Sequence, residues 1–165
     1  MISPVVPTLA GLIGWRLDKK KYATTWDSGE GARKEGGRWN SVGRRVVYCS
    51  LDPATTIVEL AVHTGFPYLN ANPHVLTKFS VADSGNIRIV LPVDVPNANW
   101  LRPGDPSAGQ QLFGDGLLAA HPFVLFPSVV STHSWNLAFD PGLANGLYSS
   151  SEQEAFDLDT RLDPP

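Results

Sequence analysis

Apolar positions along the chain come in short runs or alternate with polar positions, and turn-forming residues separate them. This pattern predicts strands, because alternation with a period of two places successive side chains on opposite faces of a sheet. The predicted strands are residues 12–17, 45–50, 74–81, 86–91, 122–130 and 134–139.

Two helices are predicted between these strands. Asp52 before Pro53 is the order of a helix N-cap and a first helical residue, and Gly65 can end the helix after Thr64. A weaker pattern predicts a second helix over residues 107–120.

Composition favours one domain with many turns. The 165 residues include 14 prolines and 15 glycines, and 42% of them are hydrophobic. Residues 92–106 are predicted to be irregular, and Tyr148 and Phe156 are expected to dock the C-terminal segment on the domain. Because strands and helices interleave without a regular β–α–β rhythm, we expect a mixed α+β fold in a single domain over residues 1–165.

Charge, cysteine content and hydropathy narrow the function classes. A net charge of −3 argues against a nucleic-acid-binding surface as the main task of the chain. The single cysteine, Cys49, excludes an internal disulfide and suits a reducing compartment. No signal-peptide pattern is visible, and no apolar run reaches the roughly 20 residues that span a bilayer. We therefore expect a soluble cytoplasmic protein that binds no membrane.

The segment from Gly29 to Gly43, GEGARKEGGRWNSVG, is the most distinctive part of the chain. Its five glycines allow tight turns and close approach to a ligand. Its arginines offer planar forks that suit phosphate oxygens. The segment predicts a loop that holds an anionic group.

Common enzyme motifs are absent from the chain. The glycine-rich segment is neither a Walker A loop nor a G-x-G-x-x-G dinucleotide turn, and no G-x-S-x-G elbow marks a nucleophilic serine. The four histidines lack metal-ligand spacing, so no metal site is expected.

Several polar residues lie in apolar surroundings, and each has two interpretations. Glu59 either belongs to the polar stripe of its helix with Thr56 and His63, or faces a cleft where it stabilises positive charge or binds a ribose hydroxyl. Arg16 either pairs with a carboxylate or points into an anion site.

The same choice holds for three further residues. Tyr48 either packs or lines a pocket, and Arg38, between a glycine and a tryptophan, either stacks or binds an anion. The hydroxyl of Ser128 either bonds the backbone, as buried serines usually do, or faces a ligand.

Taken together, these motifs resemble the RES domain, the toxin of Xre–RES toxin–antitoxin pairs. GEGARKEGGRWNSVGRRVVYCSLDPATTIVELAVH resembles the N-terminal half of that domain, and QLFGDGLLA at 111–119 its weaker middle motif. FPSVVSTHSWNLAFDP at 126–141 resembles its C-terminal signature, with Asp140-Pro141 where Asn-Pro is commoner.

The resemblance implies a fold like the ADP-ribosyltransferase core and an activity on NAD. Members destroy NAD by cleaving the nicotinamide–ribose bond, with water or phosphate as acceptor, and at least one ADP-ribosylates a protein. The arginine, glutamate and serine of the family name would be Arg16 or Arg38, Glu59 and Ser128. NAD is the substrate, and no further cofactor is implied. The resemblance implies catalytic roles for Arg38, Tyr48, Glu59 and Ser128, and NAD binding by Arg16, Arg38, Tyr48 and Asn40.

The resemblance also implies partners. An Xre-type helix-turn-helix antitoxin would bind this chain and carry the DNA contacts, and a homodimer is expected within the complex. Two alternatives stay open from the sequence: transfer of ADP-ribose to a target protein, and a non-catalytic module that binds a partner.

Overall fold

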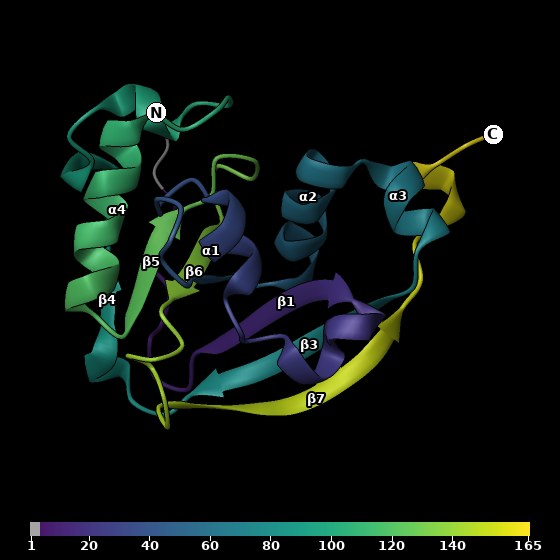
Figure 1. Cartoon of the computed structure of the whole chain (residues 1–165), viewed down its shortest axis with the longest axis horizontal. Helices are drawn as coiled ribbons and strands as arrows, with labels where there is room; N and C mark the ends of the chain where they lie inside the picture. Colours follow the sequence, from purple (N-terminus) through teal and green to yellow (C-terminus); the bar gives the residue numbers. More distant parts are fainter. Residues whose placement is uncertain (1–3) are drawn as a thin grey trace.

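The computed structural model describes residues 4–165, whose strands form one sheet in the order β4-β5-β6-β2-β1-β3-β7 (Figure 1). Neighbouring strands are antiparallel except β4 and β5, which are parallel. The strands are β1 (Ile13–Lys19), β2 (Val47–Ser50), β3 (His74–Val81), β4 (Ile87–Ile89), β5 (Phe123–Pro127), β6 (Trp135–Phe139) and β7 (Tyr148–Phe156).

The α-helices lie at two places along this sheet. In Figure 1, α4 runs beside β4 and β5, whereas α2 and α3 lie above the half that contains β1 and β3. The helices are α1 (Glu30–Glu35), α2 (Pro53–Thr64), α3 (Phe66–Ala71) and α4 (Ala108–Ala120). Short 3-10 helices cover Lys20–Thr25, Ser84–Asn86, Pro92–Asp94, Ala98–Leu101 and Thr160–Leu162. The predicted α+β fold class is confirmed.

The two faces of β2 belong to different apolar clusters, as its alternation predicts. Val47 and Cys49 pack on one side of the sheet with Phe79 and other aromatic rings. Val46 and Tyr48 pack on the other side, in a cluster that includes Leu118 of α4. A third cluster lies under α2 and α3 and buries Leu17, Leu69, Leu76 and Leu158. The centre of the sheet is therefore covered on both sides.

Helix α2 begins and ends where its sequence predicts. The carboxylate of Asp52 accepts a hydrogen bond from the backbone nitrogen of Thr55 at 2.8 Å, so it caps the exposed N–H groups of the first turn. Gly65 follows with a φ of +82°, a backbone conformation that residues other than glycine rarely adopt. Apolar residues of the helix face the sheet, and Ile57 and Leu60 pack on the third cluster.

Several expected elements differ from the structure. β4 forms one edge of the sheet, whereas β3 lies next to β7 at the other edge. β3 and β4 are therefore not neighbours, although only a short turn separates them in sequence. The strand expected over 122–130 ends at Pro127. The segment that was expected to be irregular contains two short 3-10 helices, and β7, α1 and α3 were not predicted. β7 escapes the pattern because residues 149–155 are polar or small and all exposed at the sheet edge.

No helix among residues 4–165 has the length and apolar character required to cross a bilayer.

Candidate active site

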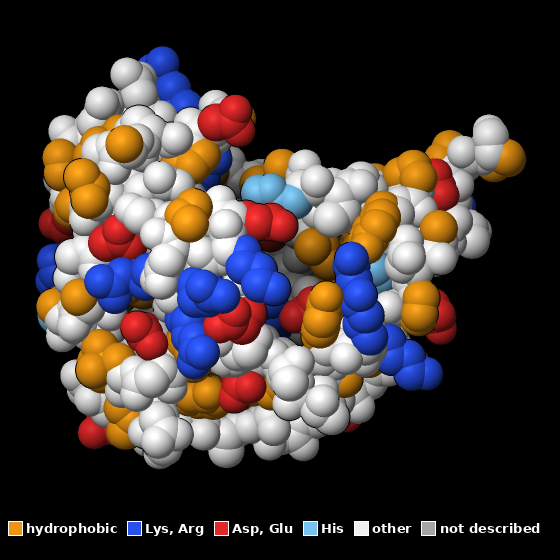
Figure 2. Space-filling model, viewed as in Figure 1, with side chains coloured by type: hydrophobic (Ala, Val, Ile, Leu, Met, Phe, Trp, Pro, Cys, Tyr) orange, Lys and Arg blue, Asp and Glu red, His pale blue; other side chains and the backbone are white. Residues whose placement is uncertain are grey.

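A polar strip lies on the sheet between the cluster under α4 and the cluster under α2. Its strand residues share one face, since Ser50 of β2 is in register with Asn136 of β6, and Tyr48 precedes Ser50 by two positions. We call the group formed by Arg38, Tyr48, Glu59, Ser128 and Asn136 the notch. Figure 2 shows this side of the molecule hollowed between α1 and α2, with basic and acidic side chains around the hollow.

Glu59 projects from α2 toward the ends of β5 and β6. Its Oε1 accepts a hydrogen bond from Oγ of Ser128 at 2.7 Å and another from Nδ2 of Asn136 at 2.5 Å. The hydroxyl of Ser128 in turn accepts one from the backbone nitrogen of Ser131 at 2.9 Å. Glu59 is half-buried, whereas His63 of the same helix is exposed. Glu59 therefore points toward Ser128 and Asn136 and forms no exposed stripe with His63, and its role on a substrate stays a prediction.

Ser128 is placed by a turn that follows β5. The strand ends at Pro127, and the backbone nitrogen of Ser128 donates to the carbonyl oxygen of Ser134 at 3.0 Å. The side chain is only 3% exposed, yet its hydroxyl bonds a carboxylate from another element as well as the local backbone. Its position 69 residues from Glu59 in sequence makes this contact a product of the fold.

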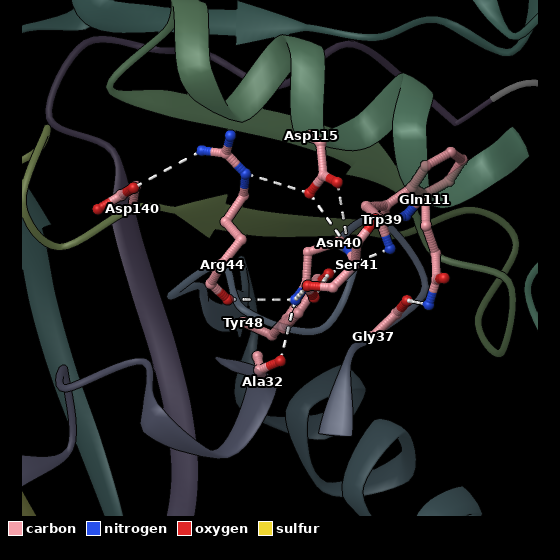
Figure 3. A network of polar contacts seen from close by, with 10 residues as sticks. All are labelled: Ala32, Gly37, Trp39, Asn40, Ser41, Arg44, Tyr48, Gln111, Asp115 and Asp140. Atoms are coloured by element: carbon pink, nitrogen blue, oxygen red, sulfur yellow. Dashed lines mark hydrogen bonds and ion pairs between the residues drawn. The ribbon is translucent and has the colours of Figure 1, made fainter. Parts of the chain in front are cut away.

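Tyr48 of β2 binds Asn40 of the glycine-rich loop (Figure 3). Oη of Tyr48 donates to Oδ1 of Asn40 at 2.7 Å and accepts from the backbone nitrogen of Trp39 at 3.1 Å. Asn40 is fully buried, and its Nδ2 donates to the carbonyl oxygens of Ala32, Ser41 and Arg44. Burial raises the pKa of Tyr48 above its usual range. The phenol stays protonated, and both side chains use their polar atoms to hold the loop.

Helix α4 supports the other side of the same loop (Figure 3). Nε2 of Gln111 donates to the carbonyl oxygen of Gly37 at 2.9 Å. The carboxylate of Asp115 accepts from the backbone nitrogen of Ser41 at 3.2 Å and pairs with Nε of Arg44 at 3.1 Å. Between them, Gly114 lets the helix lie against the backbone of the loop, since a Cβ there would be 2.1 Å from the carbonyl oxygen of Trp39. The middle motif of the sequence is thus the surface on which the loop docks.

Arg38 leaves the loop toward the segment after the Ala98–Leu101 turn. Its NH2 donates to the carbonyl oxygen of Gly104 at 2.7 Å, and its NH1 lies 3.4 Å from that of Trp100. Burial lowers the pKa of Arg38, and the negative charge of Glu59 acts in the opposite direction. The neighbouring Trp39 stacks on Phe126 with ring centroids 4.4 Å apart. Arg38 is therefore held by backbone oxygens within electrostatic reach of Glu59.

Arg16 is placed differently from the other predicted site residues. On β1, Trp15 is in register with Ser50, so the next residue starts from the opposite face of the sheet. NH2 of Arg16 pairs with Asp18 at 2.9 Å, and NH1 donates to the carbonyl oxygen of Tyr48 at 2.8 Å. Its Nε is buried without a hydrogen-bond partner among residues 4–165. Arg16 therefore has the carboxylate partner of its first interpretation, and it contacts the notch through the backbone of Tyr48.

No role was assigned from the sequence to Asn136, Ser50, Gln111 or Asp115, although all four lie in segments that resemble the family's motifs. The one usable signal was Asn136, an amide in the otherwise apolar strand WNLAF, where asparagine is disfavoured unless its polar atoms find partners. Within the part of the chain that the structure describes, no three or more His, Cys, Asp or Glu side chains gather as a metal site would require.

Comparison with known proteins assigns the family. The RES domain model matches residues 13–160. The chain therefore belongs to the RES domain family, as its motifs predict.

Relatives and a solved structure agree with this assignment. The protein named Toxin Res of Photorhabdus laumondii subsp. laumondii is 25% identical over 158 residues, which covers 92% of this chain and 97% of that protein. The Prs ADP-ribosylating toxin of a Sphingobium species is 29% identical over 134 residues, 77% of this chain and 81% of that toxin. The fold is also similar to a chain of the M. tuberculosis MbcT–MbcA toxin–antitoxin complex, with a TM-score of 0.69, 17% identity and coverage of 89% of this chain and 85% of that one.

Proposed function

We propose that this chain is the toxin of a toxin–antitoxin pair and that it consumes NAD by cleaving the bond between nicotinamide and ribose. The observation that carries the proposal is the carboxylate of Glu59, held in the notch by Ser128 and Asn136 and within electrostatic reach of Arg38. Membership of the RES domain family and the names of the relatives support it.

The chemistry needs a fixed negative charge beside the sugar and a cation for the phosphates. When the bond between ribose C1′ and the pyridinium nitrogen breaks, the bonding electron pair leaves with neutral nicotinamide. The ribose then carries an oxocarbenium-like charge, which the carboxylate of Glu59 stabilises. The guanidinium of Arg38 binds the pyrophosphate by charge-assisted hydrogen bonds. An oxygen of water or phosphate bonds to C1′, and a water that attacks releases a proton to solvent.

The remaining predicted residues shape the site. The phenol of Tyr48 already bonds Asn40 and Trp39, so only the ring of Tyr48 is available to nicotinamide or the adjacent ribose. Asn40 affects NAD binding only indirectly, because its hydrogen bonds fix the position of the loop. Phosphate binding by Arg16 would require its ion pair with Asp18 to open.

Transfer of ADP-ribose to a protein is the second candidate. It is favoured by the relative named Prs ADP-ribosylating toxin, which is 29% identical to this chain. The bond broken in NAD is the same, and only the acceptor differs. Label from radioactive NAD that stays on protein in a lysate would support transfer, and label found only in small molecules would support hydrolysis or phosphorolysis.

The proposal includes an antitoxin, because the similar solved chain belongs to a toxin–antitoxin complex. In line with the family, we expect an Xre-type helix-turn-helix protein, toxin homodimers within the complex, and action on NAD in the cytoplasm. A purely partner-binding role would be favoured if the chain alone, expressed without its antitoxin, failed to arrest growth.

Product analysis tests the enzymatic proposal. Purified protein is incubated with NAD, with and without phosphate, and nicotinamide, ADP-ribose and its 1″-phosphate are separated by chromatography. We expect nicotinamide release by the wild type and by Glu152→Gln, a matched change on the exposed edge strand β7. Glu59→Gln should lose at least about 100-fold in kcat, since it removes the stabilising charge. Undiminished turnover in Glu59→Gln would refute the assigned role.

A further inference from the structure

Asn136 is the one polar residue of the otherwise apolar strand β6, where it follows Trp135. Its neighbours in register are Phe126 of β5 and Ser50 of β2, and the residues on either side of it in β6 are buried. The half-buried amide of Asn136 loses part of its water, and this costs free energy unless its donors and acceptors are satisfied. The partners that it finds are Ser50 on one side and Glu59 on the other.

The two donors that reach Glu59 converge on one of its oxygens. Nδ2 of Asn136 and Oγ of Ser128 both donate to Oε1. Hydrogen bonds to an ionised carboxylate are short and strong, so together they fix both the position of Oε1 and the rotation of the carboxylate. Oε2 accepts no hydrogen bond from any side chain or backbone nitrogen among residues 4–165, and it is the oxygen left for a ligand.

The carboxylate of Glu59, which can only accept, determines which way the amide of Asn136 points, and the hydroxyl of Ser50 complements that orientation. This hydroxyl donates to Oδ1 of Asn136 at 2.8 Å, and Ser50 is only 2% exposed. With the amide reversed, Oδ1 would face the carboxylate oxygen of Glu59, and two acceptors would be in contact. The chain of donors therefore runs in one direction, from Ser50 to Asn136 to Glu59.

We propose that Asn136 is a positioning residue for Glu59, and that Ser50 acts through Asn136. Asn136 and Ser128 fix Oε1 so that Oε2 meets the sugar of the substrate in the geometry that the transition state needs. This inference rests on the proposed cleavage of NAD. It adds two residues, from β2 and β6, to those for which the resemblance implies a role.

Steady-state kinetics with matched variants tests the proposal. Asn136→Ala should lower kcat for nicotinamide release by about ten- to 100-fold, as is usual when the group that orients a functional side chain is lost. The KM for NAD should stay within about twofold, because the interaction matters in the transition state. Asn136→Asp should be at least as impaired, since it places a second carboxylate against Glu59. Asn145→Ala, an exposed asparagine, serves as the control and should match wild type.

The role of Ser50 gives a second, independent comparison. Ser50→Ala should reduce kcat, and Ser50→Thr, which keeps the hydroxyl, should restore most of it. In an Asn136→Ala background, Ser50→Ala should cost nothing more, and in a Glu59→Gln background Asn136→Ala should cost nothing more. Additive losses in either background would overturn the proposal, as would a normal kcat in Asn136→Ala.

An NMR measurement separates failure of this inference from failure of the proposed function. The side-chain amide proton of Asn136 that is donated to Glu59 should resonate far downfield in the wild type, and its shift should change in Glu59→Gln and in Ser50→Ala. If the wild type cleaves no NAD, the proposed function is refuted. The chemical shifts of Asn136 still show whether Asn136 contacts and positions Glu59. An Asn136 amide insensitive to both substitutions would overturn the inference even in an active enzyme.

Discussion

The phenol of Tyr48 donates a 2.7 Å hydrogen bond to the side chain of Asn40, and this contact joins the glycine-rich loop to β2. The polar atoms of both side chains form hydrogen bonds within the protein. Asn40 also donates to three backbone oxygens, and Tyr48 accepts from the backbone nitrogen of Trp39. The polar atoms of Asn40 and Tyr48 therefore build the wall of the notch, and we propose that Arg38, Glu59 and the ring of Tyr48 make the substrate contacts.

Replacement of Tyr48 by phenylalanine tests the contact with Asn40. The change leaves Oδ1 of the fully buried Asn40 without its donor, and an unsatisfied buried group costs about 1 to 3 kcal/mol. We expect Tyr48→Phe to lower the free energy of unfolding in urea by that amount. Tyr22→Phe, at an exposed tyrosine, is the control and should change little. Equal stability of the two variants would contradict the account of the loop.

Two glycines of α4 give a matched pair for the docking of the loop. A Cβ at Gly114 would be 2.1 Å from the carbonyl oxygen of Trp39, whereas nothing lies within 4 Å of one at Gly116. Gly114→Ala must push the loop away from the helix, and we expect a loss of about 2 to 3 kcal/mol in stability together with reduced NAD turnover. Gly116→Ala should gain about 0.5 to 1 kcal/mol, because alanine favours the helix. Urea denaturation measures both, and similar effects at the two positions would be inconsistent with this packing.

The planar fork of Arg38 is predicted to matter as well as its charge. Its two terminal nitrogens face different backbone oxygens, and a lysine offers one point charge instead. Arg38→Lys should raise the KM for NAD about tenfold, which corresponds to about 1.4 kcal/mol of lost binding. Arg102→Ala is the control, since that side chain is exposed and only its backbone oxygen faces Arg38. An unchanged KM in Arg38→Lys would argue against phosphate binding by this residue.

Cys49 should be inert in the folded protein. Burial raises the pKa of its thiol to about 12, and an unfolded cysteine titrates near about 8.5. The folded state thus keeps a proton that the unfolded state releases, so this contribution to stability is complete below about pH 8.5 and is lost as pH rises toward 12. Iodoacetamide at pH 8.5 should alkylate the protein slowly in buffer and rapidly in urea. Because Cys49 is the only cysteine, the alkylated mass reports this site alone; equal rates would show that the thiol is accessible.

Local sequence patterns were sufficient to predict the elements whose start and end residues are themselves characteristic. The strand over residues 74–81 and the helix from Pro53 to Thr64 have the expected bounds, because alternation, an N-cap and a C-terminal glycine are all local. Helix α1 was missed because it lies in a glycine-rich segment of low helix propensity. There Glu30 pairs with Arg33 within the helix and with Arg45 beyond it. The order of the strands in the sheet depends on long-range pairing, which no window of sequence contains.

The residues of the candidate site likewise fall into those that local motifs indicate and those that depend on long-range pairing. The motifs indicated Arg38, Tyr48, Glu59 and Ser128, and the structure brings these four to one side of the sheet. Both Asn136 and Ser50 lie in the segments that resemble the family, but no role was assigned to either, because a strand register had to place an amide opposite a hydroxyl before either could be seen to act on Glu59. The position of Arg16 likewise required the register of β1, which sets the face from which its side chain starts.

The order of strands in the sheet also has a consequence for protein synthesis. β2, which carries Tyr48, lies between β1 and β6, and Asn136 follows Glu59 by 77 residues. A nascent chain that has released α2 from the ribosome still lacks both donors to Glu59 and the strand that borders β2. The carboxylate acquires its fixed geometry only when the last part of the chain has emerged. A growing or prematurely terminated polypeptide should therefore be harmless to the cell that makes it, and toxicity should begin with the finished chain.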